Sequence, residues 1–342
     1  MTACPRCGAN LPADARVCGA CNHLVHAERL GVLAAQAAAE EASNDLSAAL
    51  GTLRAMLDLL PAGTRQAHQL SERVQGLSLR LDTPEAAPAP GRSGAKGLGA
   101  LAASAVAIAW KGKFFLVFAL TKAKFLLLGL TKLPTLLSMF LAVGAYAMVF
   151  GWKFALGFVL SIYVHEIGHV VALNRYGIAA SAPMFIPGFG AFVRLNQYPA
   201  NEREDATVGL AGPLWGLGAA AACALVWLAT DAALAAALAR TGAWINLFNL
   251  TPIWQLDGGR GFRALDRSQR WLAVGALGLA WFVSGDVMVL IIAVVAVFRT
   301  ATDAPSLTGD RRILWLYVAL VLLLAGLMAY VPDPLARPVA VM

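Results

Sequence analysis

The chain has 342 residues, of which 59% are apolar and 14% charged, and its mean hydropathy is +0.66. Soluble globular domains contain about 45–50% apolar and about 25% charged residues. The composition therefore excludes a purely soluble enzyme, a disordered protein and a disulfide-stapled secreted module. The net charge of +7 comes from residues 91–342, where basic side chains alternate with apolar segments. We interpret these side chains as contacts with lipid headgroups rather than as a nucleic-acid surface.

Four of the five cysteines lie in the first 26 residues, in two C-x-x-C pairs separated by ten residues. Two such pairs can present four thiolates to one tetrahedral zinc ion. Two disulfides or two redox dithiols are the alternative. Disulfides are disfavoured because the N-terminus has no apolar segment typical of a secretory signal, and the paired spacing within so short a segment favours zinc. We therefore predict a structural zinc ribbon at 1–26, with the ligands Cys4, Cys7, Cys18 and Cys21.

Residues 27–82 are predicted to form a soluble helical hairpin or coiled coil, because leucine and valine recur there at spacings of three and four. The hairpin would mediate self-association or contact with a partner protein, or it is a spacer that folds on itself. Residues 83–99 are rich in Pro, Ala and Gly and are predicted to be a linker. Residues 100–134 follow as a basic segment at the membrane interface. This segment and the thiolate zinc site favour a cytoplasmic N-terminus.

Residues 135–335 are the predicted transmembrane domain of an all-α polytopic membrane protein. Each apolar segment approaches the ~20 residues that a spanning helix needs. Residues 183–195 are too short to span and contain proline and glycine, which predicts either a re-entrant β-hairpin or a simple loop. A strand edge in such a hairpin could receive an unwound substrate segment. We predict about six spans, at 135–152, 154–174, 206–229, 232–253, 271–298 and 312–331.

The second predicted span contains a His-Glu-x-x-His motif. Residues four apart lie on one face of a helix, so His165 and His169 can bind one zinc ion. Glu166 lies beside them, where it can take a proton from a water molecule bound to the metal. Zinc lowers the pKa of such a water to about 7. A chance motif is disfavoured, because it would place three ionisable groups in hydrocarbon without a function.

A catalytic zinc site needs a third protein ligand and one open position. Asp257 and Asp286 are the remaining acidic candidates in the apolar region. Asp257 follows Pro252, which ends a helix, and precedes two glycines that free the backbone. Asp286 lacks this context and could instead cap a helix or mark its end. We therefore favour Asp257 as the third ligand.

These motifs resemble the three signatures of the site-2 proteases, the intramembrane zinc metalloproteases. The signatures are the His-Glu-x-x-His motif, the Ala-Gly-Pro at 211–213 and the segment from Asn249 to Arg260, and they occur in the family's order. The resemblance implies three core membrane helices that hold zinc. It also implies the site residues His165, His169 and Asp257 as ligands, Glu166 as catalytic base, and Asn249 in substrate binding or oxyanion stabilisation.

Two residues depart from the family pattern. Gln255 stands where members commonly have proline, and Gly216 stands where many have asparagine. Neither residue is a predicted ligand, so the departures concern the substrate groove more than the chemistry.

We therefore predict an intramembrane zinc metalloprotease with one catalytic and one structural zinc ion. The resemblance implies membrane-spanning protein substrates, often membrane-tethered transcription regulators, and we expect no nucleic-acid partner. A metal transporter and a catalytically inactive membrane scaffold are the alternatives. A transporter needs several successive sites, whereas only two histidines lie in the apolar region. An inactive scaffold would have no use for Glu166 beside zinc.

Overall fold

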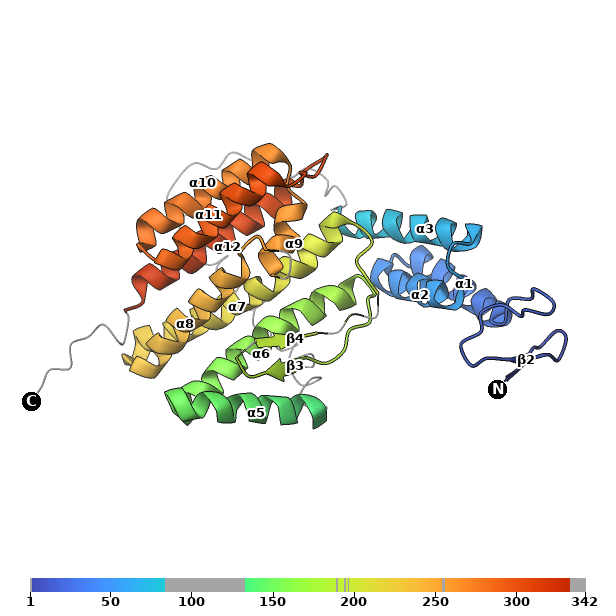
Figure 1. Cartoon of the computed structure of the whole chain (residues 1–342), viewed down its shortest axis with the longest axis horizontal. Helices are drawn as coiled ribbons and strands as arrows, with labels where there is room; N and C mark the ends of the chain where they lie inside the picture. The colour runs from blue at the N-terminus through green and yellow to red at the C-terminus, as the bar shows by residue number, and fades with distance from the viewer. Residues whose placement is uncertain are drawn as a thin grey trace, which may run out of the picture.

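The computed structural model describes residues 2–83, 133–188, 190–193, 195, 197–253 and 256–332. These residues form a bundle of helices with a smaller N-terminal domain at one end (Figure 1). The predicted all-α membrane architecture is confirmed. Apart from their ends, the predicted linker at 83–99 and the basic segment at 100–134 lie outside the described residues.

The N-terminal domain begins with a short ribbon, in which β1 (Thr2–Ala3) pairs antiparallel with β2 (Asn10–Leu11). Leucine and valine side chains of the helices that follow the ribbon pack into one buried cluster, as their spacing predicts. There are three of these helices, one more than the predicted hairpin contains: α1 (Ala27–Ala42), α2 (Leu46–Leu59) and α3 (Arg65–Asp82).

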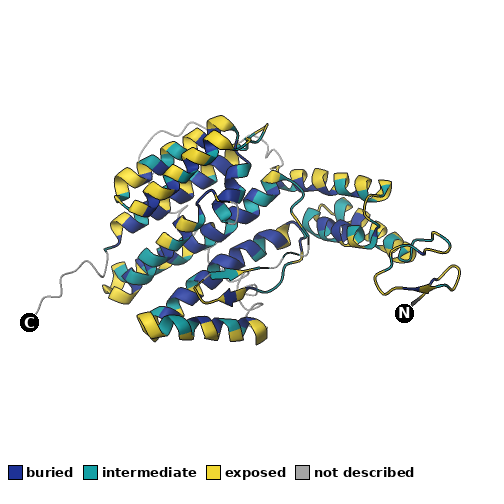
Figure 2. Ribbon diagram, viewed as in Figure 1, coloured by how far each residue is buried: buried dark blue, intermediate teal, exposed yellow. Residues whose placement is uncertain are grey.

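The larger domain contains eight helices and one β-hairpin among the residues that the structure describes. In chain order these are α5 (Leu133–Phe150), α6 (Trp152–Arg175), β3 (Met184–Ile186), β4 (Gly190–Phe192), α7 (Glu202–Thr230), α8 (Ala233–Asn249), α9 (Asp257–Arg263), α10 (Arg267–Ser284), α11 (Val287–Thr302) and α12 (Arg311–Tyr330). By length and composition, α5, α6, α7 and α12 can cross a membrane. Exposed positions lie along the outward faces of the outer helices (Figure 2). They include large apolar residues such as Phe140 and Phe282. A bilayer would cover such surfaces.

The prediction of one span at 271–298 is wrong, because two helices occupy this region. Gly285 ends α10 with a positive φ of 64°, a conformation that glycine adopts without steric cost. Asp286 then caps α11, and its Oδ1 accepts a hydrogen bond of 2.8 Å from the Met288 amide. The two helices pack against each other. α11 has 16 residues and α8 has 17, fewer than the ~20 that a perpendicular span needs.

Helices α6, α7 and α8 lie side by side through the middle of the larger domain (Figure 1). α5 and the β3–β4 hairpin lie on the α6 side, and α10, α11 and α12 lie on the α8 side. The most extensive buried apolar cluster contains residues of every helix from α7 to α12. The central helices are therefore shielded on both sides, which creates an interior where polar side chains can be placed away from lipid.

Buried polar contacts attach the N-terminal domain to the ends of α6 and α7. Arg54 on α2 forms an ion pair with Glu204 on α7, and both side chains are buried, at 4% and 0% exposure. Ser78 on α3 donates to the same carboxylate at 2.9 Å. The Tyr176 hydroxyl, at the end of α6, donates to Asp82 at 2.9 Å, and burial together with this carboxylate raises the pKa of the hydroxyl. Helix α6, which carries the two candidate histidines, is thus held to α7 from outside the bundle.

Candidate active site

Helix α6 carries the His-Glu-x-x-His motif in the interior of the bundle. His165, Glu166 and His169 are only 5%, 7% and 8% exposed. Gly168, inside the motif, allows α7 to approach closely, because a Cβ at this position would lie 2.5 Å from the Ala211 carbonyl oxygen. The motif therefore faces a tightly packed contact with α7 rather than the surrounding lipid.

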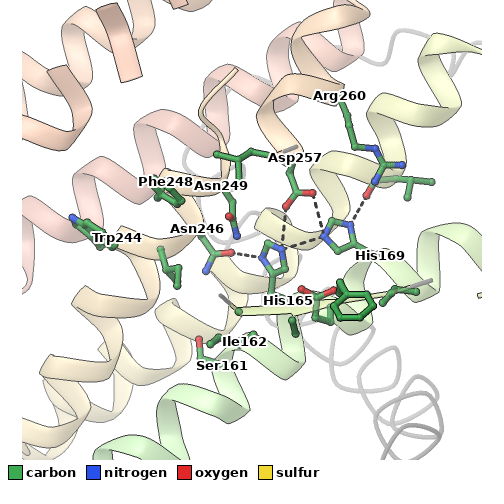
Figure 3. Close-up of a pocket in the computed structure, with 18 of the residues that line it drawn as sticks. Ser161, Ile162, His165, His169, Trp244, Asn246, Phe248, Asn249, Asp257 and Arg260 are labelled. Carbon is green, nitrogen blue, oxygen red and sulfur yellow. Dashed lines mark hydrogen bonds and ion pairs between the residues drawn. The ribbon is translucent and has the colours of Figure 1, made fainter. Parts of the chain in front are cut away.

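Asp257 reaches the two histidines because the chain breaks between α8 and α9. It is the first residue of α9. Its Oδ2 lies 3.0 Å from His165 Nε2, and its Oδ1 lies 3.3 Å from His169 Nε2 (Figure 3). The structure thus brings together the three side chains that the sequence predicts as ligands. Asp286, the other acidic candidate, serves as the cap of α11.

Two sets of contacts hold α9 and the preceding turn in place. Asp205 on α7 accepts hydrogen bonds from Arg260 at 2.8 Å and from Arg263 at 2.7 Å. The Tyr317 hydroxyl of α12 donates to the Leu250 carbonyl at 2.6 Å, at the point where α8 ends. The carboxylate of Asp257 is therefore positioned by helices on both of its sides.

The hydrogen bonds of the imidazoles determine which nitrogens face the centre of the site. His169 Nδ1 lies 2.8 Å from the Val208 carbonyl oxygen, and His165 Nδ1 lies 2.7 Å from Asn246 Oδ1. A carbonyl oxygen only accepts hydrogen bonds, so each Nδ1 carries a proton and donates it. The lone pair of each Nε2 then points toward Asp257, an arrangement typical of histidines that bind metals.

The three side chains fit a zinc ion in both chemistry and spacing. Their donor atoms all lie within 4.8 Å of one another, and the two Nε2 atoms are 3.1 Å apart. Tetrahedral zinc with bonds of about 2.0–2.1 Å places neighbouring ligand atoms about 3.3 Å apart. Gly212 on α7 keeps the adjacent space open, since a Cβ there would contact both Nε2 atoms.

A cavity of about 670 Å³ opens onto these side chains. Glu166 and Asn249, the predicted catalytic residues, both line this cavity. Ala191 and Phe192 of β4 also line it, so the β-hairpin lies next to the candidate ligands. A peptide in this cavity could contact the metal-binding side chains, a carboxylate and an amide at the same time.

Asn246 is a site residue that the sequence motifs did not reveal. It is 1% exposed and lies in an apolar stretch of α8, one helical turn before Asn249 (Figure 3). Residues three apart share a helix face. A buried amide needs hydrogen-bond partners. The spacing between the two asparagines could therefore predict that Asn246 shares a helix face with Asn249. It could not predict that Asn246 contacts His165.

The ribbon brings its four cysteines together as a second group of potential metal ligands. All four are free thiols whose sulfur atoms lie within 4.8 Å of one another. Cys4 and Cys21 sulfurs are 3.7 Å apart, and those of Cys7 and Cys18 are 3.6 Å apart. Zinc–sulfur bonds of about 2.3 Å in a tetrahedron give sulfur separations of about 3.7 Å. Backbone amides of Arg6 and Cys7 lower the pKa of Cys4 to about 6, whereas burial and the neighbouring thiols raise the pKa of Cys21, so one thiol of this pair ionises before the other.

Comparisons with known proteins agree with this geometry. Residues 153–233, which include all of α7 and all but the first residue of α6, match peptidase family M50. A stretch of 62 residues is 37% identical to a probable zinc metalloprotease, EGY2, of Arabidopsis thaliana chloroplasts. This stretch covers 17% of the chain and 11% of that relative. No solved structure matches the chain. The predicted resemblance to the site-2 proteases is thereby confirmed, and the segment that carries the His-Glu-x-x-His motif is similar to peptidase family M50.

Proposed function

We propose that this protein is a zinc metalloprotease that hydrolyses peptide bonds of membrane-spanning proteins, in regulated intramembrane proteolysis. The observation that carries the proposal is the meeting of His165, His169 and Asp257 in one cavity with Glu166. This cavity lies between helices that are apolar enough to cross a bilayer. The match to peptidase family M50 supports the metalloprotease class.

The two histidines and Asp257 would hold the catalytic zinc ion. When bound, the ion would supply Lewis-acid activation of water and of the scissile carbonyl. Glu166 takes a proton from the attacking water and delivers it to the leaving amine. The Asn249 side chain lines the same cavity, where its amide would donate a hydrogen bond to the developing oxyanion.

The β-hairpin offers a means of presenting the substrate in an extended form. In the described part of the chain, β3 and β4 form a two-stranded antiparallel sheet. Strand β4 lines the cavity, and a substrate segment would pair with its free edge as an added strand. This step matters because a helical substrate hides its peptide bonds within its own hydrogen bonding. The substrate segment would therefore unwind before cleavage.

The N-terminal domain would lie on the cytoplasmic side of the membrane. Its four thiols would hold a second, structural zinc ion, since a site with four protein ligands leaves no position for a substrate. Helices α2 and α3 already use part of their surfaces to bind α6 and α7. The remaining surface would be available for self-association or for a partner protein.

The test is a Glu166→Gln variant of the full chain, reconstituted in vesicles with membrane proteins from the same cells. We expect the variant to keep its zinc but to produce no new peptide termini when the vesicles are examined by mass spectrometry. Glu202→Gln, the same substitution at an exposed position of α7, is the matched control and should cleave normally.

Two results would count against the proposal. Cleavage by purified, zinc-loaded Glu166→Gln protein would refute the role of the carboxylate. If vesicles with the wild-type protein take up zinc but produce no new peptide termini, the result would favour a metal transporter.

A further inference from the structure

We infer that Asn246 is a positioning residue that orients His165 for metal binding, and that Gly216 is the residue that makes room for it. The inference rests on the proposed zinc site and adds to it a residue, Asn246, that lies outside the sequence motifs. It starts from the hydrogen bond of 2.7 Å between Asn246 Oδ1 and His165 Nδ1 (Figure 3).

The Asn246 amide is held at both of its ends. Its Nδ2 donates to the Gly242 carbonyl at 2.7 Å, one turn earlier on α8. Since a carbonyl can only accept, this bond establishes which end of the amide is the nitrogen. The oxygen must then face His165, and the imidazole must carry its proton on Nδ1. The lone pair on Nε2 is thereby directed toward Asp257, 3.0 Å away.

The space that Asn246 occupies exists because α7 has a glycine at position 216. A Cβ on Gly216 would overlap the Asn246 amide, and its three nearest atoms would all belong to that side chain. Gly216 and Asn246 are both buried. The two residues therefore act as a matched pair, which gives a structural reason for the departure from the family pattern at Gly216.

The experiment measures cobalt(II) binding to the full chain, because cobalt(II) reports its ligands through visible absorption. Metal in the cysteine cluster is identified by thiolate charge-transfer absorption and serves as an internal reference. Asn246→Leu keeps a similar volume but removes the acceptor. Asn246→Asp restores an oxygen acceptor. We expect the leucine variant to lose about 10–100-fold in affinity at the histidine site, as substitutions do when they remove the hydrogen-bond partner of a metal-binding histidine. The aspartate variant should stay within a few-fold of the wild type.

A double-mutant cycle then tests the pairing with Gly216. Gly216→Ala should weaken cobalt binding in the wild type, because its Cβ displaces the amide. The same substitution should cost little in an Asn246→Ala background, where there is no amide to displace. Gly218→Ala is the matched control, since a Cβ at that exposed position of α7 contacts nothing within 4 Å.

The outcomes separate this inference from the proposed function. Wild-type protein that binds no cobalt outside the cysteine cluster would overturn both. Wild-type binding with an unchanged affinity in Asn246→Leu would overturn only the inference. An equal cost of Gly216→Ala in both backgrounds would show that the glycine serves helix packing, and it would overturn the pairing. Where Asn246→Leu does not fold, the cycle still decides.

Discussion

Replacing Gly212 by alanine perturbs the candidate metal site without removing any ligand. A Cβ at this position would lie 2.6 Å from His165 Nε2, and closer still to His169 Nε2. Ordinary contacts of a Cβ begin at 3.4 Å, so the His165 ring would have to move by about 0.8 Å. A displacement of about 1 Å near a reacting centre costs about 100-fold in rate.

We therefore expect Gly212→Ala to lose about 100-fold in cleavage rate and at least about 10-fold in zinc affinity. The protein should still fold, because alanine favours a helix over glycine by about 1 kcal/mol. The assay is the zinc retained by the purified protein against increasing concentrations of a chelator, together with thermal unfolding in detergent.

Gly218→Ala on the same helix provides the control, because its Cβ would meet nothing within 4 Å. This variant should keep the wild-type zinc affinity and cleavage rate. A Gly212→Ala protein that folds and binds zinc as tightly as the wild type would refute the reasoning, because the imidazoles could not then lie where the structure places them.

Three further predictions concern the ion pair between the domains, the cysteine ribbon and the turn that follows α8. Arg54→Met leaves the buried Glu204 carboxylate without its ion-pair partner, and it should lower the free energy of unfolding by about 3–5 kcal/mol. SDS titration should show that Glu204→Gln restores most of this loss when the two changes are combined, and no recovery would contradict the pairing. Cys4→Ser should remove the ribbon zinc but leave cleavage intact, as metal analysis and the vesicle assay can establish; lost cleavage would link the two sites. Tyr317→Phe leaves the Leu250 carbonyl without its donor and should cost about 1–3 kcal/mol in the same titration, whereas an unchanged stability would mean that another donor replaces the hydroxyl.

The residues that could be predicted from the sequence are those whose geometry is local. His165 and His169 lie together because helical periodicity alone places them on one face. Asp257 could be proposed because Pro252 and the following glycines indicate a broken helix. Its distance to the imidazoles, however, depends on the contacts of α9 with α7.

The features that could not be predicted depend on packing between distant helices. Asn246 reaches His165 only because α6 and α8 pack together and Gly216 leaves space between them. The turn at Gly285 lies within a long apolar stretch, where hydropathy alone indicates one continuous span. The turn becomes visible only when α10 and α11 are seen to pack on each other.

The central claim is that one zinc ion is bound by His165, His169 and Asp257. Zinc-edge X-ray absorption of the full chain with Cys4 and Cys7 replaced by serine tests it most directly, because the ribbon site is then disabled. We expect one zinc ion per chain, surrounded by nitrogen and oxygen at about 2.0–2.2 Å and by no sulfur. The spectrum should lose its imidazole scattering when both histidines are also replaced by alanine. A chain that retains no zinc after the cysteine replacements, or zinc that is unaffected by the loss of both histidines, would contradict the account.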